Sequence, residues 1–245
     1  MTRLQLVVPC YNEAARLDGT AFLQLVASRD DVDVLFVNDG STDDTQTVLT
    51  DIAGKAGGRI SAIHLPRNVG KAGAVQRGVL AAFDKQPEFV GYWDADLSTP
   101  LAAVKDFLEL LDANPQVEIV MGARVKLLGR HIHRHASRHY FGRVFATGAS
   151  LALRLPVYDT QCGAKVLRAN EAVRQVFSTP FRSRWVFDVE ILARYLATTE
   201  RAVAESRIYE LPLTAWRDVP GSKVTIWHAI RAFWDLAMIG LKYSR

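Results

Sequence analysis

The chain is 245 residues long with 49% hydrophobic and 23% charged residues, a balance typical of a soluble globular protein that excludes a disordered tail or a fibre. Residues 1–120 carry 10 Lys and Arg against 17 Asp and Glu, whereas residues 121–245 carry 20 against 9, so the first half suits a cation and the second half suits phosphate or an anionic membrane. No apolar run reaches the roughly 20 residues of a membrane-spanning helix and no signal peptide is visible, so we expect a cytoplasmic protein.

Short runs rich in β-branched residues alternate with longer segments of helical period as far as residue 122. The expected strands are residues 4–9, 32–38, 59–65, 89–93 and 117–122. The expected helices are residues 17–28, 43–55, 69–83 and 100–112. This alternation predicts an α/β fold, with a mostly parallel central sheet covered by helices on both faces.

The sequence changes character after residue 122. Between Ile119 and Tyr158 there is no acidic residue, while arginines, lysines and four histidines accumulate. We expect this stretch to meet an anion, with uneven surface solvation as the alternative. A metal site made of the histidines is disfavoured, because neighbouring guanidinium groups would repel a cation and no carboxylate or thiolate is close in sequence.

The last segment, residues 224–243, places its large apolar side chains at helical spacing with basic residues between them. This pattern predicts an amphipathic helix. Such a helix either packs on the protein's own core or lies in a membrane interface, where tryptophan and basic residues are favoured.

Polar residues follow three of the predicted strands. Ligands of open α/β sheets bind beyond the carboxyl ends of the strands, and these ends carry residues 9–13 (PCYNE), 38–41 (NDGS) and 94–98 (DADLS). The glycine patterns of a dinucleotide-binding fold and of a P-loop are both absent. Gly70 and Lys71, at the start of a predicted helix, still favour a phosphate.

Asp94 and Asp96 are two residues apart, so in an extended chain both carboxylates lie on one face. Two such carboxylates can share a hard divalent cation with a diphosphate, which suits metal binding better than proton transfer. Two solvated turn aspartates would give the same pattern. The other polar strand ends favour the metal site, for which Asp94, Asp96 and Ser98 are the candidates.

Three segments in this order, residues 7–13 (VVPCYNE), 37–43 (VNDGSTD) and 94–96 (DAD), resemble the family 2 glycosyltransferases, which have the GT-A nucleotide-sugar fold. The resemblance implies Mg²⁺ or Mn²⁺ as cofactor and a nucleoside diphosphate sugar as donor. It also implies a set of donor-binding residues, namely Pro9, Tyr11, Glu13, Asp39, Lys71 and Asp94.

Further segments narrow the resemblance. Residues 68–78 are similar to the polyprenyl-phosphate sugar synthases, and residues 159–165, 184–190 and 220–224 are most similar to the dolichyl-phosphate β-glucosyltransferases. One departure is Ala164, where that branch commonly has an aromatic residue. Members often carry transmembrane helices, and this chain shows none, so we expect peripheral contact with the cytoplasmic membrane face.

The implied acceptor is a lipid monophosphate, which is largely a dianion at neutral pH and already nucleophilic. Fixed guanidinium groups would offset its repulsion from the donor diphosphate. From the family pattern we expect Arg217 to bind the donor and Asp159, Arg124, Arg138 and Lys223 to serve catalysis. Asp159 would face the sugar or orient an arginine, and Asp188 and Glu190 would orient sugar or arginines or form a surface pair.

The sequence therefore predicts a GT-A domain over residues 1–223, with a nucleotide-sugar half (1–122) and an acceptor half (123–223), followed by the amphipathic helix 224–245. The predicted activity is metal-dependent, inverting transfer of a hexose, most simply glucose from UDP-glucose, to polyprenyl or dolichyl phosphate. The alternatives are mannose transfer, another donor or a saccharide acceptor, and a non-catalytic nucleotide- or membrane-binding module. Nucleic-acid binding is not expected, because no known motif accompanies the basic stretch.

Overall fold

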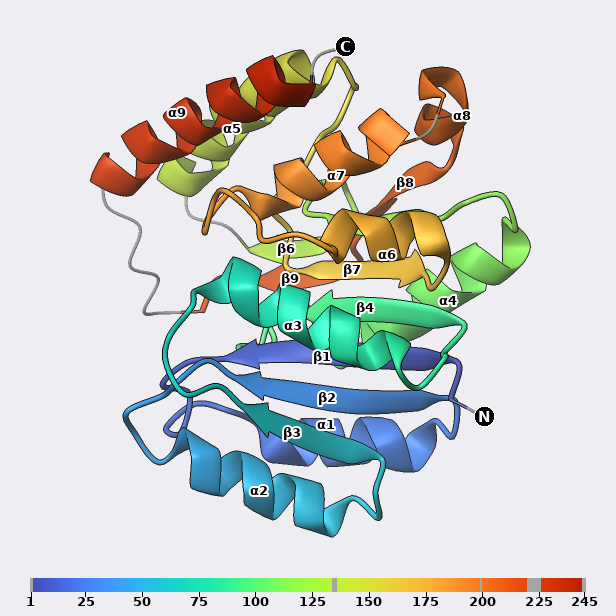
Figure 1. The fold of residues 1–245 in the computed structure, drawn as a ribbon, viewed down its shortest axis with the longest axis vertical. Coiled ribbons are helices and arrows are strands. Elements are labelled where there is room, and N and C mark those ends of the chain that lie inside the picture. Colours follow the sequence, from blue (N-terminus) through green and yellow to red (C-terminus); the bar gives the residue numbers. More distant parts are fainter. Residues whose placement is uncertain (1, 134–135, 199, 220–225, 244–245) are drawn as a thin grey trace.

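The central feature of the molecule is a sheet of seven strands in the order β3-β2-β1-β4-β7-β5-β8 (Figure 1). The computed structural model describes residues 2–133, 136–198, 200–219 and 226–243. The strands of the sheet are β1 (Leu4–Cys10), β2 (Val32–Asn38), β3 (Ile60–His64), β4 (Phe89–Trp93), β5 (Ile119–Ala123), β7 (Ala164–Arg168) and β8 (Ile208–Pro212). Neighbouring strands run parallel except at β7, which is antiparallel to both β4 and β5. The expected mostly parallel sheet is confirmed.

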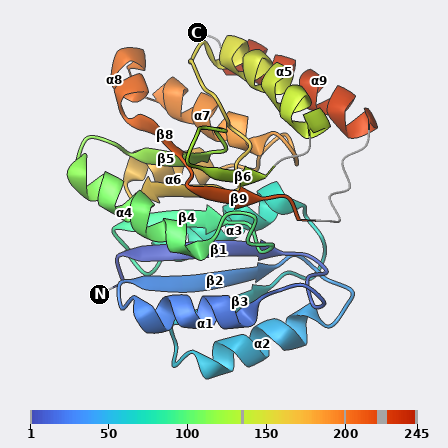
Figure 2. The same ribbon diagram turned by 180° about the vertical axis from the view of Figure 1, so that it is seen from behind.

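Helices cover both faces of this sheet. One face packs on α3 (Lys71–Phe83), α6 (Glu171–Phe177) and α7 (Phe187–Thr198), which lie in front of the sheet in Figure 1. The other face packs on α1 (Gly19–Ser28), α2 (Thr45–Lys55) and α4 (Val104–Ala113), and Figure 2 shows α1 and α4 from that side. Two apolar cores result, one on each face of the sheet.

The alternation of side chains along β1 shows how the strands feed both cores. Leu4, Leu6 and Val8 join the core under α1 and α4, whereas Val7 joins the core under α3 and α7. Because neighbouring side chains of a strand point to opposite faces, a strand covered on both sides is mostly apolar, and in β1 the buried Gln5 is the exception. The unbroken apolar run in β2 meets the same requirement.

The predicted elements up to residue 122 are all present, and their bounds differ by at most two residues except at one helix. The expected helix over residues 100–112 begins as a 3₁₀ turn, η1 (Leu101–Ala103), before α4. Pro100 stays extended (φ −60°, ψ 142°) and so lies outside the helix. The second half adds α8 (Arg201–Ser206) and a small parallel sheet of β6 (His131–His133) and β9 (Ala215–Arg217).

The predicted C-terminal helix is α9 (Ile226–Tyr243), and it packs lengthwise on α5 (Ala136–Leu153) beside α7. Glycines permit the close approach, since a methyl group on Gly148 would lie 3.0 Å from Leu236 and one on Gly240 would lie 3.3 Å from Ala152. Docking of this helix on the protein is therefore confirmed for its inner face. Within the described ranges, no helix combines the length and apolar character needed to cross a bilayer.

The packing of α3 on the sheet generates a stability prediction. A methyl group on Gly78 would lie 2.3 Å from Val7 and 2.7 Å from Val37, and both valines are buried in stiff β-strands. Gly78→Ala is therefore expected to lower the free energy of unfolding by about 1–3 kcal/mol, measured by urea denaturation.

The matched control is Gly54→Ala in α2, where a methyl group meets nothing within 4 Å. Here the gain in helix propensity is expected to raise the free energy of unfolding by about 0.5–1 kcal/mol. Equal effects of the two substitutions would contradict the tight contact of α3 with β1 and β2.

Candidate active site

The loops that follow β1 and β2 are joined by hydrogen bonds. Because these strands are parallel neighbours, their carboxyl ends lie at the same edge of the sheet. The Oδ1 atom of Asn12 accepts a hydrogen bond from the amide of Thr42 at 2.9 Å, and the amide of Asn12 donates to the hydroxyl of Ser41 at 3.0 Å. Asn12 adopts a φ of 54°, a left-handed conformation that asparagine tolerates better than most residues. The two motif loops thus form one rigid rim.

The predicted nucleoside-binding residues of the first loop differ in accessibility. The ring of Tyr11 is 44% exposed and is free to stack on a planar ligand, and Pro9 is half-buried beside it. Glu13 is buried, and both of its carboxylate oxygens accept hydrogen bonds from the guanidinium of Arg16. The Glu13 amide donates to the Thr45 hydroxyl at 2.8 Å, which ties this loop to the start of α2.

Asp39 fixes the loop that leads into α3. Its carboxylate accepts hydrogen bonds from the amides of Val69 at 2.7 Å and Gly70 at 2.9 Å. Burial raises the pKa of Asp39, and those two amides together with the guanidinium groups of Arg77 and Arg184 act in the opposite direction. Each carboxylate oxygen has a second lone pair, so Asp39 retains acceptor capacity for a ligand.

Lys71, the first residue of α3, pairs with the first aspartate of the DAD segment. Its ammonium lies 2.5 Å from Asp94 Oδ1. Burial by itself would lower the pKa of Lys71, but the negative charges of Asp94 and Asp188 raise it above its usual value. The lysine therefore stays protonated and brings a positive charge to the carboxyl end of β4.

The turn after β4 holds Asp96 by its backbone. The Ser98 amide donates to Asp96 Oδ1 at 2.9 Å, and the Leu97 amide donates to the Asp94 carbonyl at 3.2 Å. Leu97 has a φ of 51°, a conformation that a bulky side chain adopts only when its surroundings enforce it. The amide of Arg217 in β9 donates to the Ser98 carbonyl at 3.0 Å, so the predicted donor-binding Arg217, whose side chain is exposed, borders this turn.

The acceptor half meets Asp94 at Gly163. The Asp94 amide donates to the Gly163 carbonyl at 2.9 Å. A methyl group on Gly163 would lie only 1.8 Å from Asp94 Oδ2, so no side chain fits there without displacing the carboxylate. The segment that contains Asp159 and Gly163 therefore packs directly on the predicted metal- and donor-binding aspartate.

Asp159 forms a bidentate ion pair with Arg124. Its two carboxylate oxygens accept hydrogen bonds from Arg124 Nε at 2.6 Å and Nη2 at 2.7 Å, and Oδ2 also accepts from the Arg124 amide at 3.0 Å. The guanidinium lies over the ring of Trp216, 5.3 Å from its centroid. Burial tends to lower the pKa of Arg124, but the Asp159 carboxylate raises it, so the arginine remains a fixed positive charge.

Glu210 is a supporting residue that sequence reasoning missed. Its carboxylate accepts hydrogen bonds from the amides of Tyr158 (2.8 and 2.9 Å) and Asp159 (2.7 Å), and so anchors the backbone of the arginine-holding segment to β8. Burial raises the pKa of Glu210. No local pattern marks it, because its partners lie about 50 residues away in sequence.

A buried lysine, Lys165, also holds the segment of residues 159–163. Lys165 is fully buried in β7, and its ammonium donates to the carbonyls of Thr160 at 2.9 Å and Cys162 at 2.7 Å and to Asp188 Oδ1 at 2.6 Å. The Tyr92 hydroxyl also donates to Asp188. Asp188 therefore holds a lysine, and the alternative of a surface pair is wrong for this residue, which is 4% exposed.

Glu190 orients an arginine, as expected, but inside the protein. Its carboxylate, on a fully buried side chain, accepts hydrogen bonds from Arg194 Nε at 3.2 Å and Nη2 at 2.9 Å. The guanidinium also donates to three backbone carbonyls before α7. The pair fixes the segment that precedes α7. Of the predicted catalytic residues, Lys223 lies outside the described residues. Arg138 lies on α5, but its side chain is not among those described.

The donor set at the DAD turn suits a divalent cation. In the described part of the chain, no group of three His, Cys, Asp or Glu side chains converges on one point. Asp94 and Asp96 are half-buried and follow β4, the parallel neighbour of β1, so they lie at the same edge of the sheet as the rim. Mg²⁺ and similar cations are commonly held by one or two carboxylates and by substrate phosphates, which is what these two residues offer.

The comparisons with known proteins agree with this geometry. The model of the Glycosyl transferase family 2 matches residues 5–174. A dolichyl-phosphate β-glucosyltransferase of Trichomonas vaginalis is 32% identical over 97% of this chain and 70% of its own length. That of Mus musculus is 33% identical over 98% of this chain and 76% of its own length.

A solved structure shows the same fold. It is that of glucosyl-3-phosphoglycerate synthase from Mycobacterium tuberculosis in complex with Mn²⁺, UDP-glucose and phosphoglyceric acid, a GT-A glycosyltransferase. It superimposes with a TM-score of 0.65 at 21% identity, covering 98% of this chain and 80% of that one. The fold is therefore GT-A, and with the family match the chain belongs to glycosyl transferase family 2.

Proposed function

We propose that this protein transfers glucose from UDP-glucose to a polyprenyl or dolichyl phosphate. The observation that carries the proposal is the contact of Asp94 with Gly163, which brings the carboxylates of the nucleotide-sugar half against the Asp159 segment of the acceptor half. Relatives that align with nearly the whole chain are dolichyl-phosphate β-glucosyltransferases, which supports the acceptor and the sugar.

On the donor side, the exposed ring of Tyr11 is available for stacking on the base, and Asp39 can accept from a base N–H or a ribose hydroxyl. Lys71 offsets negative charge on the diphosphate. Asp94 and Asp96 would hold Mg²⁺ or Mn²⁺, with Ser98 fixing Asp96 through its amide. Such a cation would stabilise the leaving diphosphate as a Lewis acid.

On the acceptor side, Arg124 offers a guanidinium that Asp159 holds in a bidentate pair. The Nη1 atom of Arg143 in α5 is buried and has no hydrogen-bond partner among the described residues, while its guanidinium carbon lies 3.9 Å from the centroid of the Tyr158 ring. Buried donors without partners are rare in folded proteins, and an anionic ligand would satisfy this one. These cations suit a phosphate monoester, with Arg138 and Lys223 as further proposed ligands.

The chemistry requires positioning more than proton transfer. A phosphate monoester has a second pKa of about 6, so its dianion can attack the sugar without a strong general base. Both carboxylate oxygens of Asp159 accept hydrogen bonds from Arg124, and we assign Asp159 the role of orienting that arginine. Attack from the side opposite the leaving diphosphate would invert the anomeric centre.

The activity is expected in a direct assay. Purified protein, Mg²⁺ or Mn²⁺, polyprenyl phosphate and labelled UDP-glucose should yield label that partitions into organic solvent and that chelation abolishes. Label from GDP-mannose or a UDP-N-acetylhexosamine instead would replace the donor in the proposal. No label with any of these donors would overturn lipid phosphate as the acceptor.

Asp96→Ala is expected to reduce turnover roughly 100-fold or more, because it removes a carboxylate that holds charge at the leaving diphosphate. The thermal unfolding temperature should stay close to that of the parent, since Asp96 is half-buried and, among the described residues, its side chain accepts a hydrogen bond only from the Ser98 amide. The matched control is Asp84→Ala, an exposed residue that follows α3 at the end of the helix opposite Lys71. Unchanged turnover of the Asp96 variant would refute the metal site.

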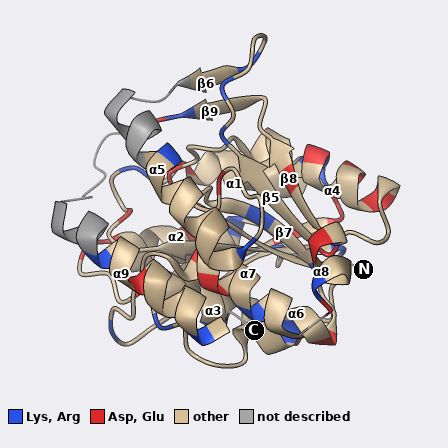
Figure 3. Ribbon diagram, turned by 90° about the horizontal axis from the view of Figure 1, so that it is seen from above, with Lys and Arg blue, Asp and Glu red and all other residues tan. Residues whose placement is uncertain are grey.

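We further propose that the protein lies peripherally on the cytoplasmic membrane face, and that α5 and α9 form the contact. Figure 3 shows that both helices are mostly uncharged where they are described. Each exposes two large apolar side chains seven residues apart, Val144 (60%) and Leu151 (75%) on α5, and Trp234 (68%) and Leu241 (77%) on α9. The seven-residue spacing keeps each pair on one side of its helix.

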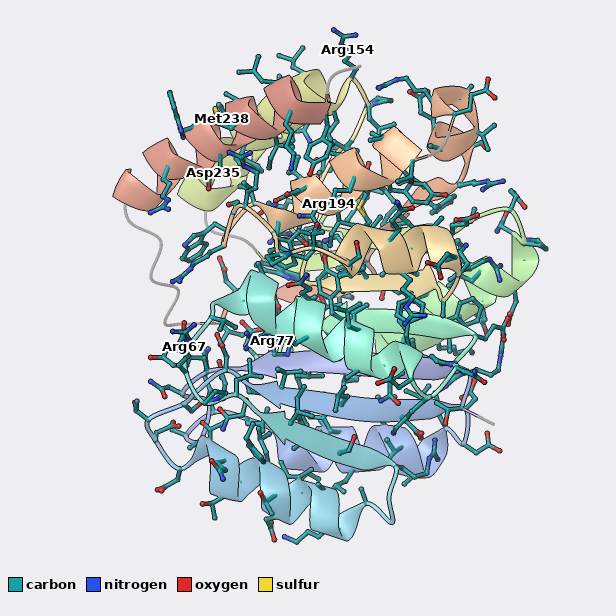
Figure 4. The ribbon with its side chains drawn as sticks, viewed as in Figure 1. Arg67, Arg77, Arg154, Arg194, Asp235 and Met238 are labelled. Atoms are coloured by element: carbon teal, nitrogen blue, oxygen red, sulfur yellow. The ribbon has the colours of Figure 1, made fainter. Side chains whose placement is uncertain are left out.

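Basic residues surround this apolar surface. Arg154 follows α5, and Arg231 and Lys242 lie on α9, all of them exposed. Figure 4 shows Arg154 and Met238 in this outer layer. Apolar side chains framed by basic ones are favoured at an anionic membrane interface. Asp235, the acidic residue of α9, instead accepts from the Ser183 hydroxyl at 2.6 Å.

Replacing both Trp234 and Leu241 by Ser is expected to weaken binding to vesicles of phosphatidylcholine and phosphatidylglycerol by about tenfold or more. Flotation of the vesicles measures the bound fraction. Tyr209→Ser on β8 is the control, because this exposed aromatic residue (42%) lies away from the two helices. Equal loss in the control and the double variant would contradict the proposed surface.

A further inference from the structure

A second positively charged group reaches the nucleotide-sugar half from the acceptor half. Arg184 lies in the segment between α6 and α7, yet its side chain covers Gly70 at the start of α3. A methyl group on Gly70 would lie 3.2 Å from Arg184 Cδ and 3.3 Å from its Cγ. Gly70 also has a φ of 84°, so glycine at this position serves both the turn and the approach of the arginine.

The backbone that carries Arg184 is fixed on both sides. Ser183 and Val186 are each 1% exposed, and the Ser183 hydroxyl accepts hydrogen bonds from the amides of Trp185 at 3.2 Å and Val186 at 3.0 Å. The same hydroxyl donates to Asp235 of α9. The exposed side chain of Arg184 therefore extends from a rigid base and not from a free loop.

The charged residues around Arg184 leave its guanidinium free to bind an anion. Lys71, next to Gly70, is paired with Asp94, whereas no carboxylate among the described residues forms an ion pair with Arg184. Asp39 feels the positive charges of Arg184 and Arg77. Figure 4 shows Arg77 and Arg67 on the side of the sheet where β1 and β2 end.

We propose that Arg184 binds the diphosphate of the nucleotide donor. The diphosphate must enter a site that already contains the carboxylates of Asp39, Asp94 and Asp96, so it needs positive charge beyond that of Lys71. A guanidinium matches two phosphate oxygens in a planar fork. Because Arg184 belongs to the acceptor half, a donor bound in the nucleotide-sugar half would contact both halves. The proposal rests on the proposed function only in requiring a nucleoside diphosphate.

Binding of nucleotides to the full chain tests this without the lipid acceptor. The probes are UDP, by calorimetry with Mg²⁺ present, and uridine, by ligand-observed NMR. Arg184→Met is expected to weaken UDP binding about tenfold to 100-fold and to leave uridine binding unchanged. Arg184→Lys, which keeps the charge but loses the fork, should bind UDP with intermediate affinity.

The matched control is Arg182→Met, an exposed arginine two residues earlier whose amide donates to Glu190 and is unaffected by the change. It should bind UDP like the parent. Unchanged UDP affinity in Arg184→Met, or an equal loss of UDP and uridine, would overturn the assignment. If Arg184→Met does not fold, the UDP and uridine affinities of Arg184→Lys decide: weaker UDP binding with unchanged uridine binding supports the assignment, and unchanged UDP binding overturns it. Normal UDP binding without transfer to polyprenyl phosphate would contradict the acceptor and not Arg184.

Discussion

The close approach of Gly163 to Asp94 is the constraint on which the site depends. A strand that returns to the middle of a sheet must bring its preceding loop to the end of its neighbour, and β7 does so beside β4. Because no side chain fits between the loop and the carboxylate, the two halves meet at the distance of a single hydrogen bond, 2.9 Å. The acceptor half therefore contacts the predicted donor-binding aspartate directly.

Charge is balanced locally on each side of that contact. Lys165 and Asp188 neutralise one another in the interior, where an unpaired charge would be costly, and they use their remaining hydrogen bonds on carbonyls and a phenol. Arg124 and Asp159 do the same nearer the surface. Each pair positions the segment of residues 159–163, so ionic groups here act as positioning elements.

Local patterns were sufficient to predict the first half and insufficient for the second. The strands up to residue 122 are recognisable in the sequence as apolar runs. The polar residues that follow them lie at one edge of the sheet, because the carboxyl ends of parallel strands meet there. The strand β7 has a lysine at its centre, and only the distant Asp188 makes that position compatible with a buried strand. Glu210 and Arg184 were missed for the same reason, since each acts on residues far away in sequence. Predicted roles for Arg138 and Lys223 stay predictions.

The hydrogen bond between Ser183 and Asp235 gives α9 a second role, because it holds the turn from which Arg184 extends. One side of α9 carries Trp234 and Leu241 outward, and Asp235 on a neighbouring side holds this turn. Removing this helix would therefore remove a support of the turn that carries Arg184 together with the proposed membrane contact. The boundary drawn at residue 223 divides the chain by composition only, and a shortened protein is a poor substitute for the whole one in any kinetic comparison.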